Sequence, residues 1–252
     1  MKKFVLIMVG LFLITTANAQ DKAALKAQKA AKKAAEKSLK EAKSTYEMSI
    51  PNPQYGRKET NYEKLETSLP LIKAAMESEY TKDNPQTWKL AADIEYQYYT
   101  KIENESKADP DNNELKKKYI ETSAKLLSYC IKYDSLLVLD TKMKPEDKDK
   151  EHKIYQPKGV NSAIQLLQAA QNYSNSENQE ELKQGAKYAE IFINAMENSN
   201  LMKDFKHAEL EGWKTYSKAF RAQSYLNIEG TNILLSLYYK WYYYWCHLFF
   251  SR

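Results

Sequence analysis

The sequence contains few cysteine, glycine, proline and histidine residues. Its 252 residues include 2 Cys, 6 Gly, 7 Pro and 3 His. Two cysteines without a framework spacing are weak support for a disulfide, and we expect Cys130 to be a small core residue. Scarce glycine and proline, with abundant Ala, Lys, Glu and Leu, favour helix over sheet. Apolar and polar residues do not alternate over any sustained stretch, so we predict an all-α protein.

The N-terminus has the three parts of a secretory signal. A positive start precedes an apolar run from Phe4 to Ile14, and Ala17-Asn18-Ala19 then supplies small residues before a cleavage point. The apolar run is about half the length of a bilayer-spanning helix, so a permanent anchor is the weaker interpretation. No cysteine lies near the cleavage point, as a lipoprotein would require. We expect residues 1–19 to be removed and the protein to be periplasmic or secreted.

The sequence carries no recognisable catalytic motif. It lacks a GxSxG elbow, a P-loop, an HExxH pair and a glycine-rich strand turn. Asp204, His207 and Glu211 have the spacing to share a helix face, but three such residues occur by chance in any polar helix, so we predict no metal. The formal charge of +5 falls to about +3 without the signal lysines, which makes no case for nucleic acid. We therefore expect a non-enzymatic protein without a cofactor.

A lysine- and alanine-rich segment follows the signal, from Asp21 to Glu47. Ala24, Ala27, Ala31 and Ala34 fall on one face of a predicted helix, among eight lysines and four acidic residues. One interpretation is a basic helix that meets an anionic surface. The favoured interpretation is a solvated spacer, because alanine offers little area for insertion in a membrane. Two prolines and a glycine in residues 49–57 then predict a linker, so residues 20–57 form a helix and linker before the main domain.

Beyond the linker, the sequence predicts helices joined by polar turns. Asn84 and Pro85 have the residue types of a helix cap and a first helical position. The charged run from Lys142 to Lys153 is interpreted as a loop, and Pro70 is expected to kink the first helix. The expected helices span residues 61–78, 88–103, 114–139, 160–173, 180–196 and 206–226.

Three segments share a pattern of aromatic and small residues. The first is Trp88-x-x-Ala91-Ala92, the second is Leu166-x-x-Ala169-Ala170-x-x-Tyr173, and the third is Trp213-x-x-Tyr216-Ser217-x-x-Phe220. Residues 58–230 thereby resemble the divergent tetratricopeptide-repeat proteins that bacteria export. The resemblance implies helical hairpins stacked as a short α-solenoid. The residues expected to pack the repeats are Trp88, Ala92, Ala124, Ala170, Tyr173, Ala189, Trp213 and Phe220.

The resemblance also has departures. The intervals between the three segments differ from one repeat of about 34 residues, the repeats lack the family's glycine and terminal proline, and Glu95 replaces an expected aromatic residue. An irregular helical bundle is the alternative fold. The family implies binding of a protein or peptide in a concave groove, so we expect an envelope scaffold. The alternative function is surface attachment through the basic helix or the C-terminal tail, and membrane association is the less favoured interpretation.

Tyrosine is unusually abundant, with 20 residues. Several tyrosines cluster within residues 96–99. We expect most of them to pack between helices, and the best candidates for a binding groove are Tyr96 and Tyr99.

The composition changes abruptly in residues 231–252. This tail has nine aromatic residues and no acidic residue. A membrane anchor would place Lys240 and His247 within the span, and a packed helix would need an apolar stripe that the tail lacks. The favoured hypothesis is that the reading frame shifted near Gly230, which would leave the last hairpin incomplete. The other two frames of the DNA after codon 230 test it.

Overall fold

The computed structural model describes residues 2–203 and 210–229, and these residues are almost entirely helical. The all-α prediction is confirmed for this part of the chain, where the only β-type pairing is one isolated bridge between Asn52 and Arg57. The helices are α1 (Lys2–Ser49), α2 (Tyr62–Glu66), α3 (Ser68–Glu77), α4 (Pro85–Ala108), α5 (Asn113–Leu139), α6 (Pro145–Tyr173), α7 (Gln179–Asn198), α8 (Asn200–Lys203) and α9 (Leu210–Glu229), with one 3-10 turn, η1 (Pro53–Tyr55).

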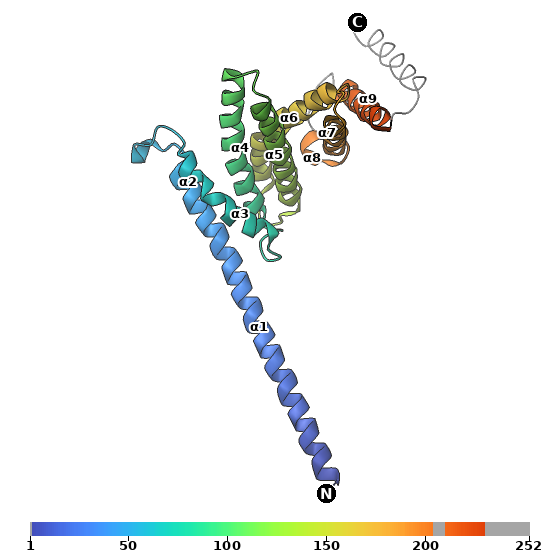
Figure 1. The fold of residues 1–252 in the computed structure, drawn as a ribbon. Helices are drawn as coiled ribbons and strands as arrows, with labels where there is room; N and C mark the ends of the chain where they lie inside the picture. Colours follow the sequence, from blue (N-terminus) through green and yellow to red (C-terminus); the bar gives the residue numbers. More distant parts are fainter. Residues whose placement is uncertain (1, 204–209, 230–252) are drawn as a thin grey trace. The chain divides into compact units, whose positions relative to one another are not determined.

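The chain divides into two compact units between Thr87 and Trp88. In the first unit, the C-terminal part of α1 packs against α2 and α3 (Figure 1). Leu65, Ile72 and Ala75 form its small apolar core together with Ala42 of α1. Residues 61–87 therefore belong with the lysine-rich helix in the structure, whereas the sequence suggested a domain start near residue 58.

Pro70 divides the first expected helix into two. The sequence predicted one kinked helix over residues 61–78, but α2 ends at Glu66 and α3 begins at Ser68. Proline has no backbone N–H, so it cannot donate to the carbonyl of Glu66 four residues earlier. Asn61 caps α2 by accepting from the backbone N–H of Lys64 at 2.8 Å.

The predicted linker caps the C-terminal end of α1. Gly56 adopts a φ of +68°, a conformation that glycine tolerates without a Cβ clash. The turn lets the Arg57 guanidinium return to the helix, where it donates to the carbonyl oxygens of Met48 at 2.6 Å and Glu47 at 2.9 Å. These bonds satisfy carbonyls that lack partners at a helix end.

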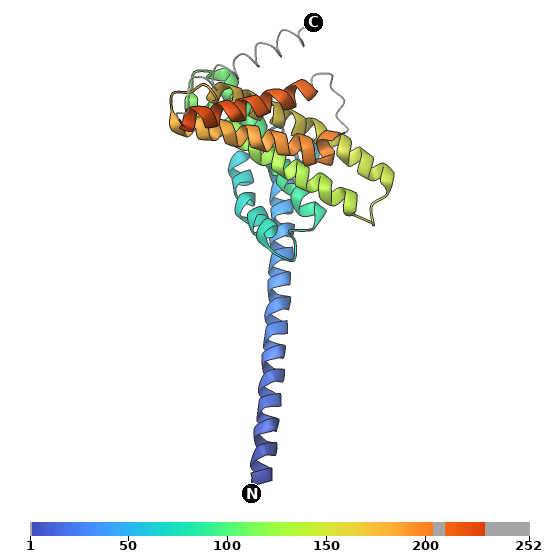
Figure 2. The same ribbon diagram turned by 90° about the vertical axis from the view of Figure 1, so that its right-hand side faces the viewer.

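The second unit contains two long helical hairpins, α4–α5 and α6–α7, followed by α9. Trp88 near the start of α4 meets Tyr129 in α5, whereas Tyr99 meets the earlier Tyr119, so these helices are antiparallel. A turn of four residues connects α4 to α5, and a turn of five residues connects α6 to α7. Helix α9 lies against α7 and also contacts α6 (Figure 2). Each hairpin is therefore a pair of antiparallel neighbours, and α9 adds a further helix beside the second pair.

Helix α6 begins at Pro145, so the prediction of a loop from Lys142 to Lys153 is wrong from Pro145 onward. Pro145 occupies the first helical position, and Glu146 and Asp147 lie in the first turn, where carboxylates interact favourably with the helix dipole. The charges that suggested a loop are consistent with a solvated helix face. Lys153 pairs with Asp149 at 2.6 Å one turn away.

Asparagine side chains cap three of the long helices, and the sequence predicted the first of these caps. The Asn84 side chain accepts from the backbone N–H of Gln86 at 3.0 Å, and Pro85 is the first residue of α4, as predicted. Asn112 and Asn178 cap α5 and α7 in the same way. These caps fix where three of the long helices begin.

Two apolar clusters hold the second unit together. One joins α4, α5, α6 and α8 around Leu126, Tyr133 and Tyr155. It also contains Cys130, whose side chain is fully buried, so the expectation for this residue is confirmed. The other cluster joins α5, α6, α7, α8 and α9 around Leu166 and Phe192. Across the described residues, no helix combines the length and apolar character needed to span a membrane.

Candidate functional site

The residues expected to pack the repeats lie within the two apolar clusters. Ala92, Ala170 and Ala189 are fully buried, where a small side chain lets neighbouring helices approach closely. Phe220 is 8% exposed. The remaining four contact the clusters from partly buried positions: Trp88, Ala124, Tyr173 and Trp213. All eight are packing residues, although packing alone does not distinguish a repeat array from an irregular bundle.

Tyr96 and Tyr99 do not form an open groove. The side chain of Tyr99 is 6% exposed, and its hydroxyl lies 2.9 Å from the hydroxyl of Tyr119 in α5. Burial raises the pKa of the Tyr99 hydroxyl. Tyr96 stacks on Tyr99, and the Nζ of Lys158 sits 4.6 Å from the centre of its ring. The groove interpretation is therefore wrong for Tyr99, because α5 covers the face of α4 that carries it.

The polar residues beside these tyrosines join the two hairpins. The Asp93 carboxylate in α4 accepts from the hydroxyl of Tyr155 at 2.7 Å and from Nζ of Lys158 at 3.1 Å, both in α6. The Nζ of Lys158 also lies 4.3 Å from the centre of the Tyr155 ring. We call the set of six residues on this interface the inter-hairpin cluster: Lys89, Asp93, Tyr133, Glu151, Tyr155 and Lys158.

The second half of the inter-hairpin cluster centres on Glu151. Its carboxylate accepts from Nζ of Lys89 at 2.6 Å and from the hydroxyl of Tyr133 at 2.8 Å. Lys89 pairs with Glu151, and the later Asp93 of α4 pairs with the later Lys158 of α6. The two helices α4 and α6 therefore run parallel. This interface was not predicted from the sequence, because Glu151 was expected to lie in a loop. The matching spacing of Lys89, Asp93 and Tyr96 with Glu151, Tyr155 and Lys158 is the signal that could have found it.

His152 and Asp134 form a separate, partly buried pair between α5 and α6. The Nδ1 of His152 lies 2.6 Å from Oδ1 of Asp134, while His152 Nε2 and Asp134 Oδ2 are buried without a hydrogen-bond partner. Within the described part of the chain, no three His, Cys, Asp or Glu side chains lie together in a way that could hold a metal ion. The structure does not describe Asp204 and His207, nor the side chain of Glu211, so this set of three lies outside the described residues.

Glu95 is a buried carboxyl on α4. Its side chain is 8% exposed, and burial raises its pKa to about 7, although the charge of Lys125 acts in the opposite direction. This is the residue that stands where the repeat pattern expects an aromatic side chain. A carboxyl group in this position titrates close to neutral pH.

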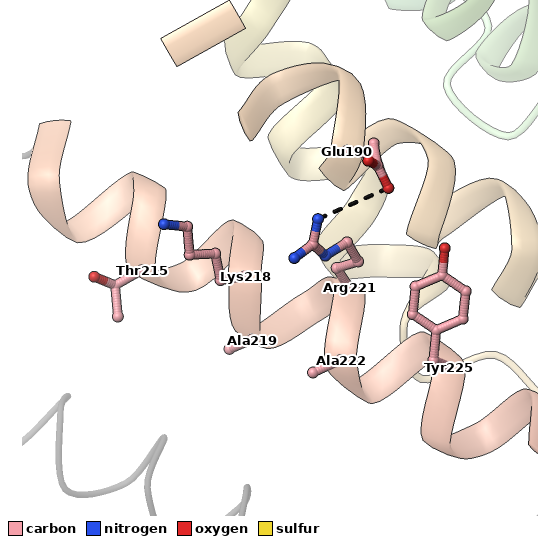
Figure 3. Close-up of a pocket in the computed structure, with 7 residues that line it drawn as sticks. All are labelled: Glu190, Thr215, Lys218, Ala219, Arg221, Ala222 and Tyr225. Atoms are coloured by element: carbon pink, nitrogen blue, oxygen red, sulfur yellow. Dashed lines mark ion pairs between the residues drawn. The ribbon is translucent and has the colours of Figure 1, made fainter. Parts of the chain in front are cut away.

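A cavity of about 660 Å³ lies at the other end of the unit, beside α7 and α9. Its lining contains two cations, one carboxylate and one tyrosine from these helices. In Figure 3 the side chains of Arg221 and Tyr225 rise toward α7, while those of Ala219 and Ala222 point away from it. The full lining is Glu190, Thr215, Lys218, Ala219, Arg221, Ala222 and Tyr225.

Ion pairs to α7 hold the two cations of the cavity. The guanidinium of Arg221 lies 3.7 Å from the Glu190 carboxylate, and Nζ of Lys218 lies 2.7 Å from the carboxylate of Glu197. The hydrogen bond and charge of Lys218 lower the pKa of Glu197. The Arg221 pair is longer than a direct hydrogen bond, so this guanidinium retains donors for a ligand.

Tyr225 is an exposed aromatic residue of α9, since its side chain is 48% exposed. The buried face of α9 instead carries Ser217, Phe220 and Ser224, which recur at three- and four-residue steps. Tyr225 lies one residue beyond that face and lines the cavity. It supplies a ring for apolar contact and a hydroxyl for hydrogen bonding.

The chain matches no family model, and it has no significant match among the curated proteins or the solved structures.

Proposed function

We propose that this protein is a non-enzymatic scaffold of the bacterial cell envelope that binds a protein or peptide through a short, tetratricopeptide-like stack of helices. The signal-like residues 1–19 would direct it to the periplasm or outside the cell. The ligand would bind at the α7–α9 cavity, and the inter-hairpin cluster would have a structural role between the two hairpins.

The arrangement of the second unit supports the solenoid interpretation. Helices α4 and α6 run parallel through the inter-hairpin cluster, and each has an antiparallel partner that follows it in the chain. Helix α9 then contacts both α6 and α7. Stacked hairpins of one direction are the organisation of helical repeat proteins. The helices, with 24, 27, 29 and 20 residues, are longer than those of a repeat of about 34 residues, so the stack is a divergent one.

The α7–α9 cavity is the single observation that carries the binding proposal. Among the described residues, it combines accessible cations with an exposed aromatic ring and a small apolar surface. Arg221 would bind a carboxylate of the ligand, and Tyr225 with Ala219 and Ala222 would contact an aliphatic or aromatic side chain. These groups recognise an acidic peptide segment that also carries an apolar residue. The charged groups of the inter-hairpin cluster pair with each other at shorter distances than Arg221 does with Glu190, and they are less exposed than Arg221.

Site-specific photo-crosslinking in the envelope tests this proposal. A photoreactive phenylalanine analogue replaces Ala222 in the cavity and, as a matched control, the exposed Lys117 on α5. We expect a discrete adduct from position 222 that is absent from position 117. The additional substitution Arg221→Glu should reduce its yield by about tenfold or more, because it places like charges together. An adduct that forms equally at both positions, or that Arg221→Glu does not change, would contradict the proposal.

A further inference from the structure

Five lysines of α1 form a stripe on one side of the helix. Lys26, Lys29, Lys33, Lys37 and Lys40 follow one another at steps of three or four residues, and all five are exposed. At 3.6 residues per turn, they fall within an arc of about 80° and extend over roughly 20 Å of helix. No acidic residue lies within this arc between Lys26 and Lys40. We call these five residues the lysine stripe.

The side of α1 that packs within its own unit lies opposite the lysine stripe. Ala35, Ala42 and Ser49 recur at seven-residue intervals and are 7%, 0% and 0% exposed. Seven residues are close to two full turns, so these three share a face, roughly half a turn away from the stripe. Helices α2 and α3 pack against α1. The packing of the first unit therefore directs the lysines outward.

Most lysines of the stripe are not paired with an acidic side chain. The acidic residues of α1 pair one turn back along the helix: Glu36 with Lys32 at 4.0 Å, Glu41 with Lys37 at 3.5 Å and Glu47 with Lys43 at 3.8 Å. Only Lys37 of the stripe takes part in these pairs. Within the described residues, Lys26, Lys29, Lys33 and Lys40 make no ion pair.

The form of the stripe fits a flat anionic partner. A helix that lies on a plane touches it along one narrow arc, and the lysine stripe is confined to such an arc. A polymer that wraps a helix would instead use cations around the whole circumference. The alanines of α1 add little apolar area, so the attraction would be electrostatic, without deep insertion.

We propose that the lysine stripe binds α1 along an anionic phospholipid surface. Each lysine close to such a surface gains from its negative potential, and several lysines act together. This inference does not depend on the peptide-binding proposal, since it concerns the first unit and uses none of the residues of the α7–α9 cavity.

Vesicle sedimentation of the exported protein, purified from cells, tests the proposal. The vesicles contain either phosphatidylethanolamine with phosphatidylglycerol or phosphatidylcholine alone. The stripe variant is K26Q/K29Q/K33Q/K40Q, and glutamine preserves helix propensity. The control variant, K32Q/K43Q/K64Q/K73Q, removes the same charge from exposed positions off the stripe in the same unit. Circular dichroism checks that both variants remain helical.

We expect binding to the phosphatidylglycerol vesicles, weak binding to phosphatidylcholine and loss of binding as salt screens the charges. The stripe variant should partition on the order of 1,000-fold less, because four favourable contacts disappear, while the control falls less than about tenfold. Equal losses in the two variants would overturn the proposal. So would binding that ignores lipid charge, or binding to a soluble anionic polysaccharide with no binding to the vesicles.

Discussion

At the scale of single residues, the buried carboxyl of Glu95 makes the stability of the fold depend on pH. A carboxyl group in water has a pKa near 4.5, and burial in α4 raises that of Glu95 to about 7. Between these values the folded chain holds a proton that the unfolded chain has released. The free energy of unfolding should therefore fall as the pH rises through this window, and the full cost of the buried charge is present above about pH 7.

The substitution Glu95→Gln should remove this cost. At about pH 8, we expect the free energy of unfolding to rise by about 3 kcal/mol, since the pKa of Glu95 is raised from 4.5 to about 7 and each pKa unit corresponds to about 1.4 kcal/mol. At about pH 4 the variant and the parent should differ little, because Glu95 is then protonated in both states. Urea unfolding followed by circular dichroism at several pH values measures this. Glu59→Gln, at an exposed position, is the matched control. If the free energy of unfolding of Glu95→Gln depended on pH in the same way as that of Glu59→Gln, the raised pKa of Glu95 would be contradicted.

At the scale of the elements, close helix contacts depend on a glycine in α7. A Cβ added to Gly185 would lie 2.9 Å from Cβ and 3.2 Å from the backbone carbon of Tyr173, and 3.1 Å from Oγ of Ser224. These atoms belong to the end of α6 and to α9, so Gly185 lies where three helices meet. The backbone atom cannot move aside without shifting α6.

The substitution Gly185→Ala should therefore destabilise the second unit. We expect the free energy of unfolding to fall by about 1 to 3 kcal/mol, since overpacking outweighs the gain in helix propensity. Thermal unfolding by circular dichroism measures the change. Gly212→Ala in α9 is the control, because the nearest atom to its added Cβ lies at 3.8 Å, an ordinary contact. Equal melting temperatures for the two variants would show that the close approach at Gly185 is relaxed in solution.

The start of α6 illustrates what the sequence could predict at this scale. The cap types at Asn84, Asn112 and Asn178 are local, because each asparagine accepts from a backbone N–H two or three residues later. The run of charges after Lys142 is equally local but ambiguous, since both a loop and a solvated helix carry such charges. Contacts of Glu151 with residues of α4 and α5 help to distinguish the two, and those partners are distant in sequence.

At the scale of the whole second unit, the inter-hairpin cluster couples the two hairpins. The side chains of Asp93 and Lys158 are 21% and 16% exposed, so their charges are poorly solvated and depend on each other. Removing one partner leaves the other charge without its compensation, whereas removing both costs less.

A double-mutant cycle tests this coupling. We expect Asp93→Asn to lower the free energy of unfolding by about 2 kcal/mol, because Lys158 remains charged and loses its carboxylate. Combining it with Lys158→Met should restore part of the loss, since Met retains apolar contact with Tyr96 and Tyr155. Urea unfolding of the parent, both single variants and the double variant gives the coupling energy. Strictly additive effects would mean that the pair does not link the hairpins energetically.

The sequence by itself determined the helical character of this protein, its caps, the burial of Cys130 and the small residues that pack between helices. These properties depend on composition and on neighbours within a few residues. The tertiary structure decided which side of each helix is covered. It placed Tyr99 under α5 and left Tyr225 half-exposed beside a cavity, although both are tyrosines on helices. Burial depends on helices that arrive from distant parts of the chain, and no local pattern specifies which of them will meet.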